Sequence, residues 1–217
     1  VGVTAAVLTC LIWSSPAFAN GPLKESQMRM RAACWNVCRV VAPMNPTEDG
    51  FSLETIAGAK KSQLRYWMAN CPPPNIADMR GSWRGLNRGL GPALIGISQF
   101  GKEFCTDDCG GHGDNIAIYQ VSPDRWSCRH SWTPVVEDGK LDRSGNFKVK
   151  HPDGTKPSPQ GVVLSYAEAK NPTCDPSRFL VDKIVRLNDR YLLGRAMMKI
   201  GPLKFHVSYF VLERGLF

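Results

Sequence analysis

The chain has 217 residues, of which 43% are hydrophobic and 21% charged, and it carries a formal net charge of +8 with a pI of about 9.2. This composition excludes a disordered or low-complexity protein over most of the chain. The basic residues are scattered along the sequence and do not form the interleaved aromatic and basic motifs of known nucleic-acid modules, so no nucleic-acid partner is expected.

Residues 1–19 have the pattern of an export signal. An apolar run over 1–13 is followed by Ser-Ser-Pro and by Ala17-Phe18-Ala19, a small-x-small cleavage pattern. A helix over that run rises only about 20 Å, short of the roughly 30 Å hydrocarbon core, which favours a cleaved signal over an N-terminal anchor. We therefore expect an exported protein, either of the thylakoid lumen or of the bacterial periplasm.

Cysteine content agrees with export. One of the eight cysteines lies in the signal, and in an oxidising compartment most of the others are expected to form disulfides. The disulfide candidates are Cys34, Cys38, Cys71, Cys105, Cys109, Cys128 and Cys174.

Residues 20–77 are expected to form a helical, cysteine-containing region. Apolar and sulfur residues recur with helical spacing over 23–41, which places Cys34 and Cys38 one turn apart on one face. Ser52 opens a second helix that runs to Cys71. The pattern predicts a helical hairpin in which Cys71 bonds to Cys34 or Cys38; the alternative is three half-buried free thiols.

From about residue 98 onward the sequence changes to short β-branched and aromatic segments separated by Gly, Pro, Asn and Asp. The last three segments are joined by the two-residue connections Asn188-Asp189 and Gly201-Pro202, which suit tight hairpins. The sequence therefore predicts a mainly β fold, an eight-stranded antiparallel up-and-down barrel whose closure hides its strand edges. The predicted strands are 98–104, 115–121, 126–132, 145–151, 161–168, 179–187, 190–200 and 203–214.

Ahead of these strands the chain has Gly81-x-Trp83, and the last strand ends at Arg214. This arrangement resembles the lipocalin pattern of the calycin superfamily, and the resemblance implies a barrel domain at 78–217. The resemblance implies that Trp83 closes one end of the barrel and that Arg214 packs across its indole. The longer stretch "GSWRGLNRGLGP" is similar to the barrel opening of lumenal lipocalins of the violaxanthin de-epoxidase type. The catalytic carboxylate of that enzyme falls where this chain has "ALIGISQF", which contains no acid.

The stretch "FCTDDCGGHGD" at 104–114 concentrates cysteine, aspartate and histidine. Its two cysteines, His112 and Asp114 would together supply the four ligands that a zinc site needs. An oxidising compartment disfavours thiolate ligands, and the Gly-Gly pair makes the loop too flexible to hold a metal rigidly. We expect a Gly-rich hairpin connection at the barrel rim, pinned by disulfides, with no metal and no cofactor. The disulfide partners left open for this stretch are Cys105 with Cys109, or either of them with Cys128 and Cys174.

The predicted function is the non-catalytic binding of a small apolar ligand, a lipid or a carotenoid-like pigment, inside the barrel. No acid–base pair is evident on the predicted inward faces, and we therefore expect no enzyme. The alternatives are an accessory subunit of a membrane-bound complex, for example a thylakoid photosynthetic one, and a de-epoxidase-related enzyme. The residues expected to line the ligand site are Val162, Leu164, Tyr166, Leu192, Met198, Phe205, Val207 and Tyr209.

Overall fold

The computed structural model describes residues 52–88, 98–107, 110–119, 132–152 and 161–215. Several sequence predictions fall outside these residues: the export signal at 1–19, the helix at 23–41, and Cys34, Cys38, Cys109 and Cys128. Within the described residues, no helix is both long enough and apolar enough to cross a bilayer.

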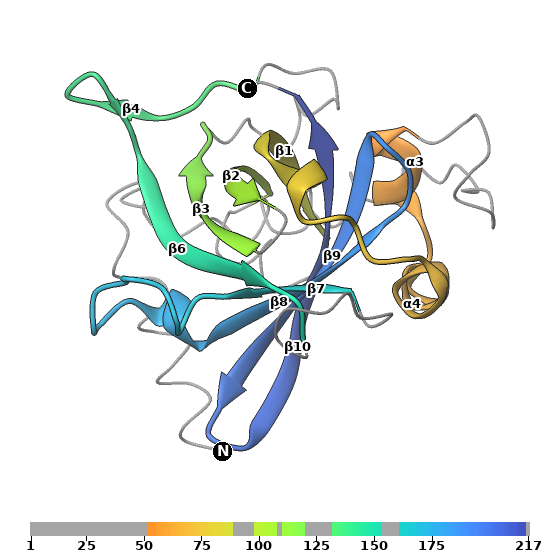
Figure 1. Ribbon diagram of the computed structural model, residues 1–217. Helices are drawn as coiled ribbons and strands as arrows, with labels where there is room; N and C mark the ends of the chain where they lie inside the picture. The colour runs from red at the N-terminus through yellow and green to blue at the C-terminus, as the bar shows by residue number, and fades with distance from the viewer. Residues whose placement is uncertain (1–51, 89–97, 108–109, 120–131, 153–160, 216–217) are drawn as a thin grey trace, which may run out of the picture.

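Eight antiparallel strands close into a barrel in the order β1-β10-β9-β8-β7-β6-β3-β2 (Figure 1). The predicted mainly β, eight-stranded antiparallel barrel is thereby confirmed. A separate pair, β4 (Val136–Glu137) and β5 (Lys140–Leu141), forms a small hairpin beside it. The barrel strands are β1 (Gly81–Arg88), β2 (Gln99–Asp107), β3 (Gly110–Ala117), β6 (Arg143–Lys150), β7 (Val162–Ser165), β8 (Leu180–Arg186), β9 (Tyr191–Ile200) and β10 (Leu203–Arg214).

One barrel strand differs from the sequence prediction. Trp83 was expected just before the first strand, but it lies within β1, which pairs with β2 on one side and β10 on the other. Gly81, Gly85 and Asn87 give this segment a low β-propensity, and its two neighbours supply the pairing that the sequence pattern does not show. Of the predicted strand at 126–132, only Trp132 is described, and it lies in no strand.

The predicted second helix is two helices, α3 (Leu53–Gly58) and α4 (Lys61–Asn70). The helix breaks at Ala59, whose ψ of 145° is not helical. The break leaves the Lys60 amide and the Ala59 carbonyl without helical partners, and each finds another. The Lys60 amide donates to Gln63 Oε1 at 2.9 Å, and the Ala59 carbonyl accepts from Arg88 at 2.9 Å. The break thus fastens the helices to the end of β1.

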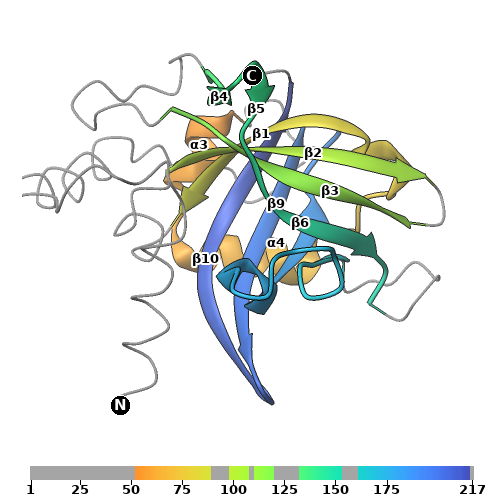
Figure 2. The same cartoon turned by 90° about the vertical axis from the view of Figure 1, so that its left-hand side faces the viewer.

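Two apolar clusters lie on the two faces of the sheet. The outer cluster joins Ile56, Leu64 and Trp67 of the helices to strand residues such as Val211, and it holds α3 and α4 against β1, β9 and β10. Figures 1 and 2 show the helices on this side of the barrel. The inner cluster fills the barrel around residues such as Phe147. Burying both faces explains why the late strands carry apolar residues on both sides of the sheet.

The β9–β10 hairpin is longer than the rest of the sheet. Beyond Met198 on β9 and before Tyr209 on β10, the two strands pair with each other and reach past the described ends of β8 and β1 (Figure 2). A register shift between His206 and Ser208 marks a bulge at Val207. The bulge reverses the facing of every later residue.

This bulge corrects one expectation. Tyr209 was expected on the same inward face as Phe205 and Val207, but it belongs to the outer cluster and is 4% exposed. After the bulge the inward residues of β10 are Phe210 and Leu212.

Candidate functional site in the barrel interior

One end of the barrel is closed by the short helix η2 (Ala77–Met79) and by Trp83. The Trp83 indole Nε1 donates to the Met79 carbonyl at 2.7 Å, and the Arg214 guanidinium lies 4.5 Å from the centre of the Trp83 ring. Arg214 also donates to the backbone carbonyls of Asp78 and Arg80. A guanidinium stacked on an indole keeps its donors free for such carbonyls, so Arg214 ties the last strand to η2 across this closed end.

A lysine lies inside the barrel. The side chain of Lys102, on β2, is 2% exposed, and its Nζ lies 2.6 Å from Asn115 Oδ1, 2.6 Å from the Tyr166 hydroxyl and 3.4 Å from Asp182 Oδ2. The four residues come from four strands or their ends, because Tyr166 directly follows β7. The interior therefore holds an ion pair within a hydrogen-bonded group that we call the Lys102 cluster.

The Lys102 cluster satisfies its own polar groups. The Lys102 ammonium donates to Asn115 Oδ1 and to the Tyr166 hydroxyl and forms an ion pair with Asp182. The Tyr166 hydroxyl donates to Asp182 Oδ2 at 2.9 Å, and Asn115 Nδ2 donates to the Gly145 carbonyl at 3.2 Å. Charges that are paired and hydrogen-bonded in this way are the kind that proteins bury.

Burial dominates the titration of the cluster. Desolvation lowers the pKa of Lys102, while the neighbouring Asp182 opposes the shift. Desolvation likewise raises the pKa of Asp182 against the opposing charge of Lys102. Desolvation and then the Asp182 charge raise the pKa of Tyr166 well above its usual value, so its hydroxyl remains a hydrogen-bond donor.

Four aromatic rings surround the Lys102 ammonium. Its Nζ lies 4.7 Å from the centre of the Phe147 ring, 5.3 Å from that of Tyr166, and 5.5 Å from those of Phe100 and Phe210. The three phenylalanine distances are within the range of a cation–π interaction, whereas the ammonium reaches Tyr166 through its hydroxyl oxygen. The ammonium is thus held by ring faces as well as by oxygen atoms.

Three of these rings lie over a glycine on the neighbouring strand. A Cβ added at Gly194 would meet the Phe210 ring at 2.0 Å, so only glycine lets this ring pack against the β9 backbone. Aromatic side chains that cover cross-strand glycines also fix strand register. The cross-strand pairs are Gly85 with Phe100, Gly113 with Phe147, and Gly194 with Phe210.

The end of the barrel opposite Trp83 is bordered by apolar side chains that are only partly buried. Phe100, Leu180 and Val207 pack against the inner cluster there. Two cross-strand pairs, Met198 with Phe205 and Ile200 with Leu203, then extend the inward face of β9 and β10 along the hairpin. Phe205 is 49% exposed and Leu203 58% exposed, so the apolar lining of the barrel continues into solvent.

The residues predicted to line a ligand site lie at different depths in the barrel. Val162, Leu164, Tyr166 and Leu192 are buried in the inner cluster. Val207 packs against that cluster from the edge. Met198 is partly exposed and Phe205 is exposed, both on the hairpin.

Sequence reasoning missed the Lys102 cluster, and the expectation that no acid–base pair faces inward is wrong. Asp182 was missed because β8 carries both apolar and charged residues on each face, so its alternation does not show which way the aspartate points. The inward position of Lys102 could have been predicted, because Phe100 and Phe104, two residues before and after it, lie on the same face of the strand.

The stretch "FCTDDCGGHGD" is a strand hairpin, as expected, but a tighter one. β2 and β3 pair through it as far as Asp107 and Gly110, which leaves only residues 108–109 for the connection. His112 is exposed on β3. Within the described parts of the chain, no three His, Cys, Asp or Glu side chains converge as metal ligands would.

The described cysteines carry free thiols. Cys71 is buried, and Cys105 and Cys174 are exposed, so the disulfides predicted for these three are not seen. Cys71 packs in the outer cluster beneath α4, and burial raises the pKa of its thiol to about 11. Its local role is therefore that of a small apolar side chain.

Comparison with known proteins identifies no family for this chain. No family model and no curated protein matches the chain. Among solved structures, a protein from Thermomonospora curvata is similar with 21% sequence identity and a TM-score of 0.40, over 72% of this chain and 88% of that chain.

Proposed function

We propose that this chain is an exported, non-catalytic, lipocalin-like protein that binds a small apolar ligand, a lipid or a pigment. The ligand lies at the end of the barrel opposite Trp83. The observation that carries the proposal is the apolar inward face of β9 and β10, which runs from the inner cluster out to the half-exposed Phe205. Exposed apolar surface that continues from a barrel lining is typical of a ligand entrance.

The geometry supports apolar recognition over charge recognition. The Lys102 ammonium is 2% exposed, donates to two protein acceptors and has its charge paired with Asp182, so the cluster offers little to an anionic ligand. The ligand contacts proposed at this end are Phe100, Leu180, Met198, Phe205 and Val207. The deeper predicted residues, Val162, Leu164, Tyr166 and Leu192, then support these contacts from below.

The test is native mass spectrometry of the chain purified from its source, followed by analysis of what denaturation releases. A lipid or pigment released in near-stoichiometric amount supports the proposal, and its structure names the ligand class. A ligand-free chain that co-purifies with a membrane complex would instead assign the accessory-subunit function. A mature mass beginning near Asn20 would support export.

Neighbouring methionines provide a matched test of the site. Met198 lies on the inward face opposite Phe205, and Met197 lies on the other face opposite His206. We expect Met198→Ser to weaken the binding of the neutral apolar dye Nile red about tenfold, because a contact with the ligand is lost. Met197→Ser should leave dye binding unchanged; equal losses in both variants contradict the proposed site.

A second candidate, a de-epoxidase-related enzyme, has one observation in its favour: Asp182, Tyr166 and Lys102 form an acid–base group inside the barrel. Burial raises the pKa of the Asp182 carboxyl, as general-acid catalysis requires. Conversion of the bound molecule that is lost in Asp182→Asn and retained in Met197→Ser would favour this candidate over the carrier.

A further inference from the structure

Basic residues that are scattered in the sequence meet on the outer side of the β9–β10 hairpin. Arg195 on β9 pairs with Lys183 on β8 and shares the outer face of the hairpin with His206, and α4, which carries Lys61 and Arg65, packs against β9. Burial and then the charges of Arg195, Lys61 and Arg65 lower the pKa of His206, in agreement with this placement. Arg195 also helps to lower the pKa of Lys183. The residues of this basic face are Lys61, Arg65, Lys183, Arg195, Lys199, Lys204 and His206.

The basic face has no carboxylate partner among the residues that the structure describes. Within the described residues, none of its seven members forms an ion pair with an aspartate or glutamate. Lys199 and Lys204 are exposed and lie directly opposite each other across the hairpin. Like charges in that position destabilise a strand pair, so the hairpin keeps an unfavourable arrangement that an anionic partner would relieve.

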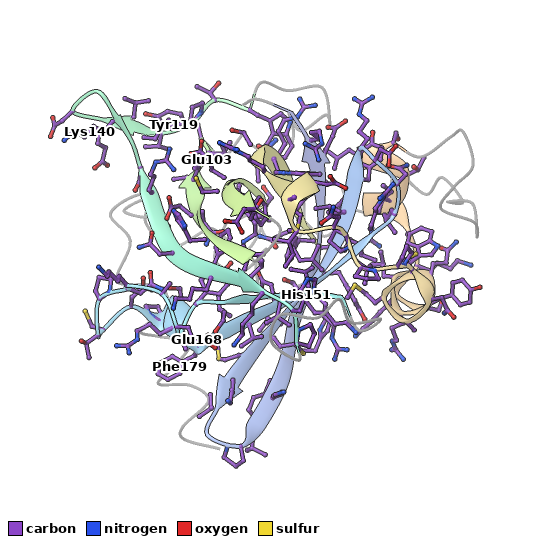
Figure 3. All side chains as sticks on the ribbon, in the orientation of Figure 1. Glu103, Tyr119, Lys140, His151, Glu168 and Phe179 are labelled. Carbon is purple, nitrogen blue, oxygen red and sulfur yellow. The ribbon has the colours of Figure 1, made fainter. Side chains whose placement is uncertain are left out.

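The other side of the same hairpin is apolar. Met198, Ile200, Leu203 and Phe205 share the face opposite the lysines, and the two β10 residues are the most exposed of the four. Phe179, on η4 (Pro176–Phe179) beside β9, is 46% exposed, and Figure 3 shows it on the same side of the molecule as the hairpin. The projecting tip thus combines apolar side chains with basic ones.

An element with exposed aromatic and aliphatic side chains and flanking lysines matches the chemistry of a membrane interface. Apolar side chains enter the boundary between headgroups and acyl chains, while the long lysine side chains reach back to the headgroups. Clustered basic residues are attracted to anionic lipid within about a Debye length of the surface. A nucleic acid or an acidic protein would account for the charges but not for the exposed Leu203 and Phe205.

We propose that the β9–β10 hairpin docks on the surface of an anionic lipid bilayer. Leu203 and Phe205 insert at the interface, and the basic face contacts the lipid phosphates. The proposal shares Phe205 with the proposed ligand entrance, but Leu203, Lys199 and Lys204 are not among the proposed ligand contacts, so the two proposals can be tested separately.

The test is flotation of the purified full chain with two kinds of vesicle, phosphatidylcholine alone and an equal mixture of phosphatidylcholine and phosphatidylglycerol. We expect binding to the mixed vesicles and not to the neutral ones, with a loss of binding at high salt. Lys199→Gln/Lys204→Gln and Leu203→Ser/Phe205→Ser should each reduce the bound fraction about tenfold.

The β4–β5 hairpin supplies a matched control. It also has an exposed apolar residue and a lysine, Val136 (49% exposed) and Lys140, and Figures 2 and 3 place it on the far side of the barrel. Val136→Ser/Lys140→Gln should bind mixed vesicles as the unmodified chain does. Circular dichroism and thermal melting establish that each variant is folded.

Three outcomes overturn the proposal: no flotation of the folded chain with anionic vesicles, equal binding to neutral vesicles, or equal losses in the hairpin variants and the control. Retention on a nucleic acid or on an acidic protein without flotation would assign the basic face to that polyanion. Lys199→Gln/Lys204→Gln changes only the face opposite Met198, so it should lose vesicle binding and keep Nile red binding, and failure of the ligand site and failure of the docking surface then give different results.

Discussion

Two groups of lysines in this protein lie in opposite environments. Lys102 is fully enclosed, and its ammonium has three oxygen partners and four aromatic rings. Lys199 and Lys204 lie exposed and opposite each other, without an ion pair to any carboxylate that the structure describes. Residues from four strands or their ends surround the one buried ammonium, whereas the two exposed ammonium groups of the hairpin have no described carboxylate partner. This difference is consistent with an interior lysine that serves the fold, and it is the ground on which we propose an anionic partner for the exterior lysines.

The largest expected effect comes from removing the buried ammonium. Lys102→Met leaves the Asp182 carboxylate buried without its counter-ion, and we expect a loss of about 3–5 kcal/mol in the free energy of unfolding. Urea titration followed by tryptophan fluorescence measures the change. Lys148→Met, at an exposed lysine on β6, is the control and should change stability little.

The double variant Lys102→Met/Asp182→Leu distinguishes a lost ion pair from lost packing. Because neither charge is then buried, we expect it to recover about half or more of the stability lost in Lys102→Met. A double variant less stable than Lys102→Met would mean that the pair is not the reason for the loss.

The next effect concerns the rings around Lys102. Gly194→Ala places a methyl group against the Phe210 ring and should displace one wall of the cage, at a cost of about 1–3 kcal/mol. Chemical denaturation again gives the value. Ala196→Gly, two residues along the same face of β9, removes a methyl group and is expected to cost less. Unchanged stability in Gly194→Ala would show that Phe210 can move without loss, so that the cage is not rigid.

A smaller effect of opposite sign is expected on the hairpin. Lys204→Glu turns the like-charged pair with Lys199 into an opposite-charged one and should raise stability by about 0.2–1 kcal/mol while it weakens vesicle binding. The same change at Lys140, which lies opposite Glu137, creates a like-charged pair and should lower stability. Thermal melting at low salt compares the two. A destabilised Lys204→Glu would remove the argument that the hairpin lysines serve a partner.

The smallest effect is a pH dependence of the basic face. The pKa of His206 is lowered in the fold, so on acidification the unfolded chain takes up the imidazole proton first, and the contribution of His206 to stability falls as the pH drops from about 7 to about 5. His206→Gln should reduce this decline, and His112→Gln, at an exposed histidine on β3, should not. Urea midpoints measured across this range give the result; an unchanged slope in His206→Gln would show that His206 does not sense the surrounding cations.

Much of the barrel could be predicted from the sequence, because alternating β-branched segments and two-residue connections depend on local chemistry. The strand predicted at 203–214 coincides with β10. The bulge at Val207 could not be predicted, since no residue type there requires it, and it moved Tyr209 from the expected inner face to the outer cluster. The helix expected over 52–71 was likewise correct in kind but broken at Ala59, where a contact with Arg88 from β1 intervenes.

The sequence by itself determined that the chain forms a closed antiparallel barrel, because strand periodicity and turn residues act over a few positions. Only the tertiary structure decided which charges are buried and which are gathered on the surface. Lys102 and Asp182 are 80 positions apart by their numbers, and the basic face draws on α4, β8, β9 and β10. Charges interact through space, so their partners depend on barrel closure and strand register, which no local pattern in the sequence specifies.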